Sequence, residues 1–118
     1  MEGLWTIEFG SSAGIFGSGV IIMRGGKIEG GDASYYYIGS YEKPNPDQPY
    51  PSAFHAKIQI KPFLPGAESV FKTVNRNLTL NLEGTLKDEN NAVAVGTPEG
   101  IPGMDVGIRL RRRIEAAA

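Results

Sequence analysis

The segment Phe54-His55-Ala56-Lys57-Ile58-Gln59-Ile60-Lys61 decides the fold class of this chain. Apolar and polar residues alternate along it without a break, so successive side chains would point to opposite faces of an extended strand. One face would be apolar, and the other would carry charged and amide groups. This pattern is typical of an antiparallel sheet that packs one face on a core and exposes the other to water.

The same alternation recurs in three other segments. Their inward residues are expected to be Trp5, Ile7 and Phe9, then Leu78, Leu80, Leu82 and Leu86, and finally Val106, Ile108 and Leu110. With the remaining apolar runs, the pattern predicts strands at residues 3–10, 16–24, 27–30, 34–42, 53–61, 77–86, 92–97 and 105–114.

Glycine and proline separate these segments, with 16 Gly and 8 Pro in 118 residues. Gly25-Gly26 lies between two apolar runs and predicts a two-residue hairpin turn. Residues 44–51 contain four prolines and predict a long loop, because proline cannot donate a ladder hydrogen bond. Residues 62–75 are the least strand-like part of the chain, and we expect one short helical turn there.

Strands with such short connections favour a closed up-and-down antiparallel β-barrel, because closure removes unpaired edge strands. Glycines inside the predicted strands, which indicate bends or close backbone approaches, are Gly17, Gly19, Gly39, Gly84 and Gly107. We therefore expect one all-β domain over residues 1–114. Residues 115–118 are expected to be a tail, and their three alanines are typical of a cloning scar.

The composition argues against several classes of protein. The chain has no Cys, which excludes disulfide scaffolds and thiolate metal sites. Lys and Arg number 12 and Asp and Glu 13, and a net charge of −1 argues against binding nucleic acid. No apolar run is long enough for a membrane-spanning helix, and the first residues do not resemble a signal peptide. We expect a cytoplasmic protein that binds neither nucleic acid nor membrane.

Sequence motifs for catalysis are missing. His55 is the single histidine and lies on the polar side of its segment, so we expect a surface or hydrogen-bonded residue. The stretch from Gly14 to Gly19 precedes a strand rather than a helix, which argues against a phosphate-binding loop. We expect no catalytic, metal or cofactor-binding residues and no enzymatic activity.

Two groups of residues have more than one interpretation. Tyr35, Tyr37 and Tyr41 share one face of their strand and form either a contact surface for another chain or a barrel wall with hydroxyls at its rim. The arginines on one side of the last strand either meet phosphates or form an ordinary wet face, and they are Arg109, Arg111 and Arg113.

The inward residues predict a barrel lining that either fills the interior or surrounds an apolar ligand. The candidate lining residues are Trp5, Ile7, Ile58, Ile60, Leu80 and Leu82.

Three segments in the first third of the chain carry a resemblance to a known family. They are the strand from Gly3 to Phe9, the glycine-rich hairpin from Gly19 to Asp32, and the aromatic strand from Ser34 to Tyr41. In this order they resemble the GrlR family of negative regulators of type-three secretion genes. The part from Gly30 to Gly39 is the most specific, and a weaker similarity continues through residues 77–80.

The resemblance implies a lipocalin-like barrel that is cytoplasmic and homodimeric and that sequesters a transcriptional activator through protein–protein contact. It also leaves room for a lipid-like ligand inside the barrel. The family holds its activator with an acidic run after the aromatic strand. The corresponding candidate partner loop here has only two acidic residues, Glu42 and Asp47, and adds the basic Lys43. We therefore expect the fold to transfer, whereas the activator does not. The two hypotheses are a regulatory protein-binding role and, as the alternative, a small hydrophobic ligand in the interior.

Overall fold

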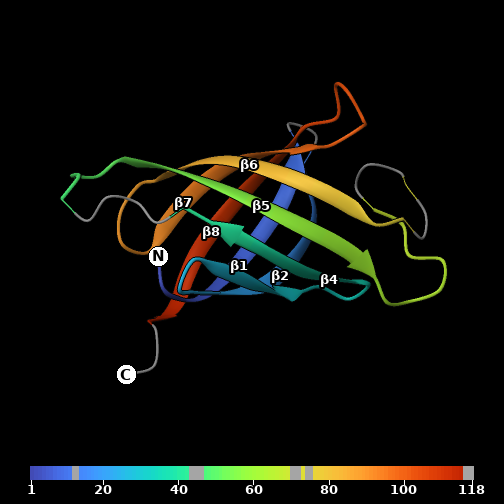
Figure 1. The fold of residues 1–118 in the computed structure, drawn as a ribbon, viewed down its shortest axis with the longest axis horizontal. Helices are drawn as coiled ribbons and strands as arrows, with labels where there is room; N and C mark the ends of the chain where they lie inside the picture. The colour runs from blue at the N-terminus through green and yellow to red at the C-terminus, as the bar shows by residue number, and fades with distance from the viewer. Residues whose placement is uncertain (12–13, 43–46, 70–72, 74–75, 116–118) are drawn as a thin grey trace.

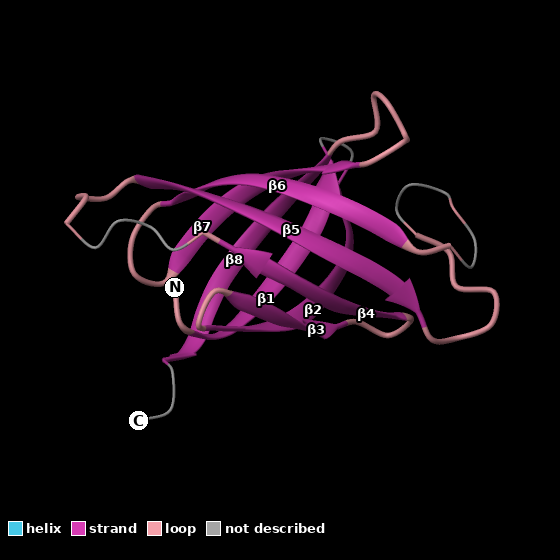
Figure 2. Cartoon of the chain, viewed as in Figure 1, coloured by secondary structure: helices cyan, strands magenta, loops and turns pink. Residues whose placement is uncertain are grey.

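The computed structural model describes residues 1–11, 14–42, 47–69, 73 and 76–115, and Figure 1 shows the chain from the N- to the C-terminus. The described residues form eight strands: β1 (Gly3–Ser11), β2 (Gly14–Arg24), β3 (Lys27–Gly31), β4 (Tyr35–Tyr41), β5 (Ser52–Pro62), β6 (Leu78–Leu86), β7 (Asn91–Pro98) and β8 (Val106–Glu115). Each strand is hydrogen-bonded to the next one along the chain. β8 pairs antiparallel with β1, which closes the barrel (Figure 2). The prediction of an all-β up-and-down antiparallel barrel is confirmed.

The inner face of the barrel follows the predicted alternation. In β5, Phe54, Ala56 and Ile58 are buried, whereas the side chains between them are exposed. In β8, Val106, Ile108 and Leu110 are buried in the same way. The apolar face points inward because burial removes its surface from water, while the charged face stays hydrated.

Glycines allow the tight geometry at two kinds of position. Gly25 and Gly26 have φ angles of 60° and 81°, the left-handed region that a two-residue hairpin turn requires, so the predicted turn is confirmed. Gly39 lies inside β4, where a Cβ atom would collide with the carbonyl oxygen of Lys57 and the Cα atom of Ile58 on β5. A side chain at Gly39 would therefore push two paired strands apart.

The helical turn expected within residues 62–75 is not formed by the described residues there. β5 continues through Pro62, and the chain then turns at Pro65 and Gly66, where Gly66 has a φ of 78°. A left-handed glycine that follows a proline cannot continue a right-handed helix. Residues 70–72 and 74–75 lie outside the described part.

The strand ends differ slightly from the prediction. β2 begins at Gly14 rather than at residue 16. β8 extends to Glu115, which pairs with Gly3, so the tail expected at residues 115–118 begins after residue 115. Residues 116–118 lie outside the described part. The described residues form no helix that is long and apolar enough to cross a lipid bilayer.

Candidate ligand-binding cavity

A cavity of about 410 Å³ occupies one end of the barrel. Its wall comes from the inward side chains of β1, β2, β4, β5, β6 and β8, including Ile7, Ile21, Tyr37, Ile58, Leu80 and Ile108. Its mouth lies at the barrel end that holds the first residues of β2 and described residues of the β3–β4 and β5–β6 connections, and includes Phe16, Asp32, Ser34, Glu68 and Ser69. We call this region the hollow end. Aliphatic side chains surround the space, so its interior suits an apolar guest.

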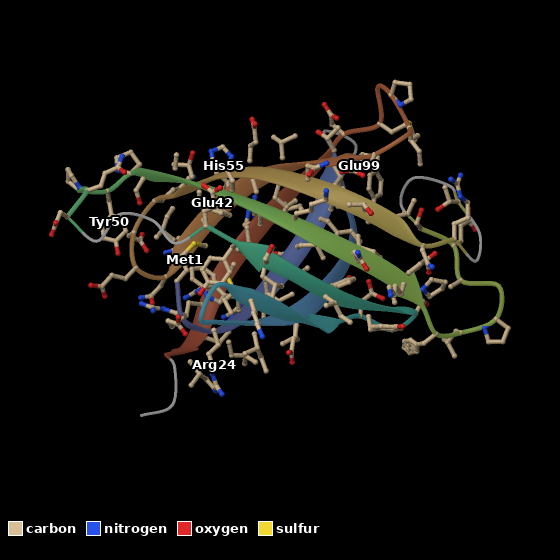
Figure 3. The ribbon with its side chains drawn as sticks, viewed as in Figure 1. Met1, Arg24, Glu42, Tyr50, His55 and Glu99 are labelled. Carbon is tan, nitrogen blue, oxygen red and sulfur yellow. The ribbon has the colours of Figure 1, made fainter. Side chains whose placement is uncertain are left out.

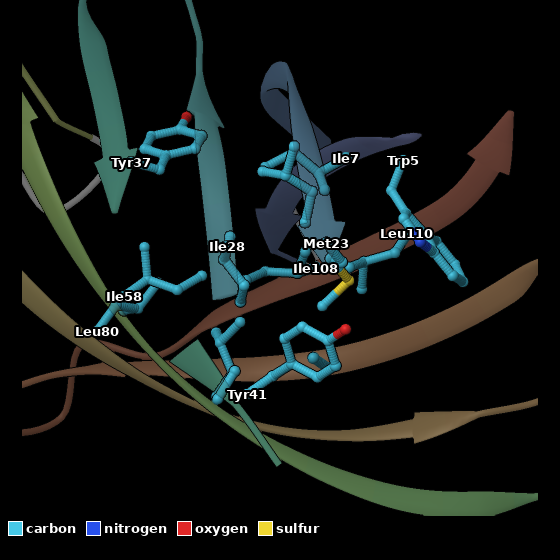
Figure 4. Close-up of a cluster of buried hydrophobic side chains, with 14 of the residues drawn as sticks. Trp5, Ile7, Met23, Ile28, Tyr37, Tyr41, Ile58, Leu80, Ile108 and Leu110 are labelled. Atoms are coloured by element: carbon cyan, nitrogen blue, oxygen red, sulfur yellow. The ribbon is translucent and has the colours of Figure 1, made fainter. Parts of the chain in front are cut away.

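The opposite end of the barrel, which we call the filled end, is packed with side chains. Its buried members that do not line the cavity include Trp5, Met23, Ile28, Tyr41, Phe54, Leu86 and Ala92. Figure 4 shows part of the inner cluster, with Trp5 beside Leu110 on one side and Tyr37 on the other.

Polar contacts close the filled end. The indole N–H of Trp5 donates to the carbonyl oxygen of Met1 at 3.0 Å. The Arg112 guanidinium lies 5.9 Å from the centre of the Trp5 ring and donates to the carbonyl oxygen of Glu2 at 3.2 Å. Arg112 also donates to the side-chain oxygen of Asn90 at 3.1 Å. These contacts hold a cation over the ring, where the π-electrons attract it.

Five of the six predicted lining residues contact the cavity: Ile7, Ile58, Ile60, Leu80 and Leu82. Trp5 is wholly buried but belongs to the filled end. The two interpretations of the interior therefore each describe one end of the barrel.

The contact-surface interpretation of Tyr35, Tyr37 and Tyr41 is wrong. Their side chains are only 4%, 5% and 7% exposed, because β4 turns this face toward the barrel interior. The outer face of β4 carries Tyr36 and Ile38 instead, which are 42% and 49% exposed. The alternative, a barrel wall of tyrosines, describes the structure.

Hydrogen bonds hold the three tyrosine hydroxyls. Tyr37 donates to Oδ2 of Asp32, Tyr35 donates to the carbonyl oxygen of Ala67 at 3.0 Å, and Tyr41 donates to the Glu2 carboxylate at 3.4 Å. Burial raises the pKa of all three tyrosines. The bond to Asp32 raises the pKa of Tyr37 further. The hydroxyls of Tyr35 and Tyr37 are thus neutral groups fixed at the mouth.

Asp32 organises the mouth of the cavity. Its Oδ1 atom accepts hydrogen bonds from the backbone N–H groups of Ser34 and Tyr35, each at 2.9 Å, which shapes the β3–β4 turn. After burial, the negative charges of Asp32 and Glu68 are the further causes that raise the pKa of Tyr35. The two carboxylates therefore act on the same hydroxyl although 36 positions separate them in the chain.

The sequence did not single out Asp32 and Glu68 as site residues. The only signal for Asp32 was its place in the Gly30-Gly31-Asp32 turn. Nothing in the sequence near Glu68 indicated that it would face a cavity, because closure of the barrel creates that proximity.

The candidate partner loop lies away from the cavity mouth. Glu42 and Asp47 are exposed, and Lys43 lies outside the described residues. The N–H of Glu42 donates to the carbonyl oxygen of His55 at 2.9 Å, and Figure 3 shows both side chains at the same end of the barrel. The His55 side chain is exposed on the outer face, where its register partner is Glu83.

Three arginines of β8 lie on the outer face that the alternation predicts, and a fourth contacts the ring of Trp5. Arg109, Arg111 and Arg113 are exposed on the outer face of β8. In the β1–β8 pairing Arg112 lies opposite Trp5, in the same register as the pairs from Thr6 to Gly10, and the register shifts only beyond this pair, between Trp5 and Leu4. Sequence alternation alone did not indicate the role of Arg112 over the indole.

Apolar side chains also gather on the outside of the barrel. Val20, Ile22, Tyr36, Ile38 and Ile114 are each 42% to 62% exposed. They lie on neighbouring strands of one face. Leu4 is the register partner of both Ile22 and Ile114. Glu29 is the register partner of both Ile22 and Ile38, so the face extends over β8, β1, β2, β3 and β4. We call these five residues the outer apolar face.

Among the described residues, no three His, Cys, Asp or Glu side chains come together as a metal site requires. No protein-family model matches the sequence, and no curated protein is significantly similar to it. The resemblance of residues 3–41 to the GrlR family stays a prediction.

Proposed function

We propose that this chain is a non-enzymatic binding protein that holds an apolar small molecule inside its barrel. The single observation that carries this proposal is the cavity of about 410 Å³ with its aliphatic wall. Its size falls within the usual range of small-molecule sites, which is roughly 300 to 1,000 Å³. An apolar guest would replace empty or hydrated space with dispersion contacts to the wall.

A fluorescent neutral probe, N-phenyl-1-naphthylamine, tests this function. The wild-type protein is expected to increase its fluorescence in a saturable way. Ile58→Trp should fill the cavity from its wall and weaken binding at least about tenfold, since the added ring takes the space of the guest. The matched control is Gln59→Trp, the neighbouring position on the outer face of the same strand.

Equal probe binding by both variants would place the probe outside the cavity. No binding by the wild-type protein to this probe or to any of the dodecyl probes used below would refute the function.

A second candidate function is contact with another protein, and the outer apolar face favours it. Monomeric proteins rarely leave large contiguous apolar patches in water, and such patches mark protein contacts. We propose a second copy of this chain as the occupant. Glu29 lies between Ile22 and Ile38, and Lys27 and Lys61 lie at the margins next to Ser40 and Tyr36. A twofold axis that passes between Glu29 and one of these lysines would place the acidic side chain of each copy against the basic side chain of the other.

Light scattering after size exclusion tests this assembly. The wild-type protein should be a dimer, and Ile22→Glu combined with Ile38→Glu should yield monomers, because two charges would be buried without partners. Val95→Glu, an equally exposed apolar position on the outer face of β7, is the control and should leave the dimer intact. A monomeric wild type excludes the self-contact. A variant that stays dimeric places the contact elsewhere.

A further inference from the structure

The charged side chains among the described residues that line the cavity all have one sign. The described residues that line it include the carboxylates Asp32 and Glu68, and they include no Lys, Arg or His. Both carboxylates belong to the mouth, on the β3–β4 and β5–β6 connections. The deeper wall is aliphatic, with Ile58, Leu80 and Ile108 facing the space. An amphiphile with its tail inside would therefore place its polar end among negative charges.

The tyrosine hydroxyls add further hydrogen-bond acceptors to the mouth. The hydroxyl proton of Tyr37 is donated to Asp32, and that of Tyr35 is donated to the carbonyl oxygen of Ala67. A hydroxyl that has given its one proton offers only lone pairs to a further partner. Both hydroxyls would therefore accept hydrogen bonds from a ligand.

A fatty-acid anion does not match this mouth. Its carboxylate would lose hydration next to two protein carboxylates without gaining a cationic partner from the described lining. An ammonium group would gain favourable charge interactions and could donate up to three hydrogen bonds to the acceptors present. A neutral alcohol, with one donor, should lie between the two.

If the chain binds ligands in its barrel as proposed above, we infer that the cavity selects amphiphiles whose polar end is cationic or donates hydrogen bonds, with a long-chain amine as the simplest member, and rejects long-chain carboxylates. The tail would lie against the aliphatic wall, and the polar end would reach Asp32, Glu68 and the tyrosine oxygens at the mouth.

Calorimetric titration with three probes of one chain length separates the tail from the head group. Dodecylamine, dodecanol and dodecanoate are each titrated below their micelle concentrations at pH 7. We expect the affinity to fall in that order. The amine should bind at least about tenfold more tightly than the carboxylate. The free energy of one charge-assisted hydrogen bond typically corresponds to about a tenfold change in affinity or more.

Two substitutions test the role of the carboxylates. Asp32→Asn keeps an oxygen that can accept from the N–H groups of Ser34 and Tyr35, and Glu68→Gln changes an exposed side chain, so both should fold. The double variant should lose the preference for the amine while keeping its affinity for dodecanol within about threefold. Glu83→Gln, a carboxylate on the outer face of β6, is the matched control and should change nothing.

The outcomes distinguish this inference from the function on which it rests. Dodecanoate binding as tightly as dodecylamine, or a preference that survives in the double variant, would overturn the inference and leave the cavity as an apolar binding site. Binding of none of the three probes would overturn both.

Discussion

The two ends of the barrel are built from the same strands with the same alternation, yet one is packed and the other is hollow. At the filled end, Trp5 and Phe54 are almost completely buried and do not border the cavity. At the hollow end the aromatic rings of Tyr35 and Tyr37 belong to the wall, and hydrogen bonds hold their hydroxyls to Ala67 and Asp32 at the mouth. Alternation creates an interior, whereas the size and tethering of each side chain decide whether that interior is filled.

The comparison assigns different tasks to the two ends. The filled end supplies the close packing that stabilises a small barrel, because its side chains contact atoms on every side. The hollow end gives up part of that packing for a binding space. Three experiments test this division, from the largest expected change in the free energy of unfolding to the smallest.

Trp5→Ala should cause the largest loss. Truncating a wholly buried Trp removes its packing and its hydrogen bond to Met1, and it leaves Arg112 without its ring partner. We expect a loss of about 3–5 kcal/mol in the free energy of unfolding, measured by chemical denaturation. Thr6→Ala, on the outer face of the same strand, should cost less than about 1 kcal/mol. Similar losses for both variants would contradict a packed end built around the indole.

Leu86→Ala and Leu80→Ala form a matched pair across the two ends. Both leucines lie on β6 and both are 4% exposed, but only Leu80 borders the cavity. Truncation at Leu86 creates new empty space and should cost about 3–5 kcal/mol. Truncation at Leu80 enlarges an existing space and should cost nearer 2 kcal/mol. Equal losses in denaturant unfolding would show that the hollow end is packed as tightly as the filled end.

The smallest effect at neutral pH belongs to the tyrosines and grows in alkali. Because burial raises the pKa of Tyr35, Tyr37 and Tyr41 above the ordinary value of 10.0, the folded state holds these protons more tightly than the unfolded state. Their contribution to stability is complete below pH 10 and is lost as the pH rises above it, by up to about 1.4 kcal/mol per pH unit for each tyrosine.

Denaturant unfolding at pH 9, 10 and 11 measures this slope. Tyr37→Phe should cost about 1 kcal/mol at pH 7, because it removes the hydrogen bond to Asp32. The same variant should show a shallower decline above pH 10. An unchanged slope would mean that Tyr37 is not protected from ionisation in the folded state.

Much of the fold could be predicted because local patterns determine it. The eight strands among the described residues lie within two positions of their predicted bounds, since alternation and turn residues act over a few positions. β4 shows the limit of this reasoning. Tyr35 and Tyr37 share one face, Tyr36 and Ile38 share the other, and both faces are apolar enough to be inner or outer. Only the pairing of β4 with its neighbours settled which face points inward.

The candidate site could be predicted less well than the fold, because its residues come together only when the barrel closes. Asp32 and Glu68 come together at one mouth only because β3–β4 and β5–β6 connect at the same end of an up-and-down barrel. Arg112 lies over Trp5 only because the last strand pairs with the first. Such contacts join residues far apart in the chain, so no periodic pattern contains them.

The amino-acid sequence by itself determined the strands, the hairpin at Gly25-Gly26 and the inward set of apolar residues, because propensity and periodicity are local properties. The tertiary structure alone decided which of those inward residues meet across the barrel and which surround empty space. Packing depends on the volumes of side chains that only barrel closure brings together, and this is why Trp5 fills one end while Leu80 lines a cavity at the other.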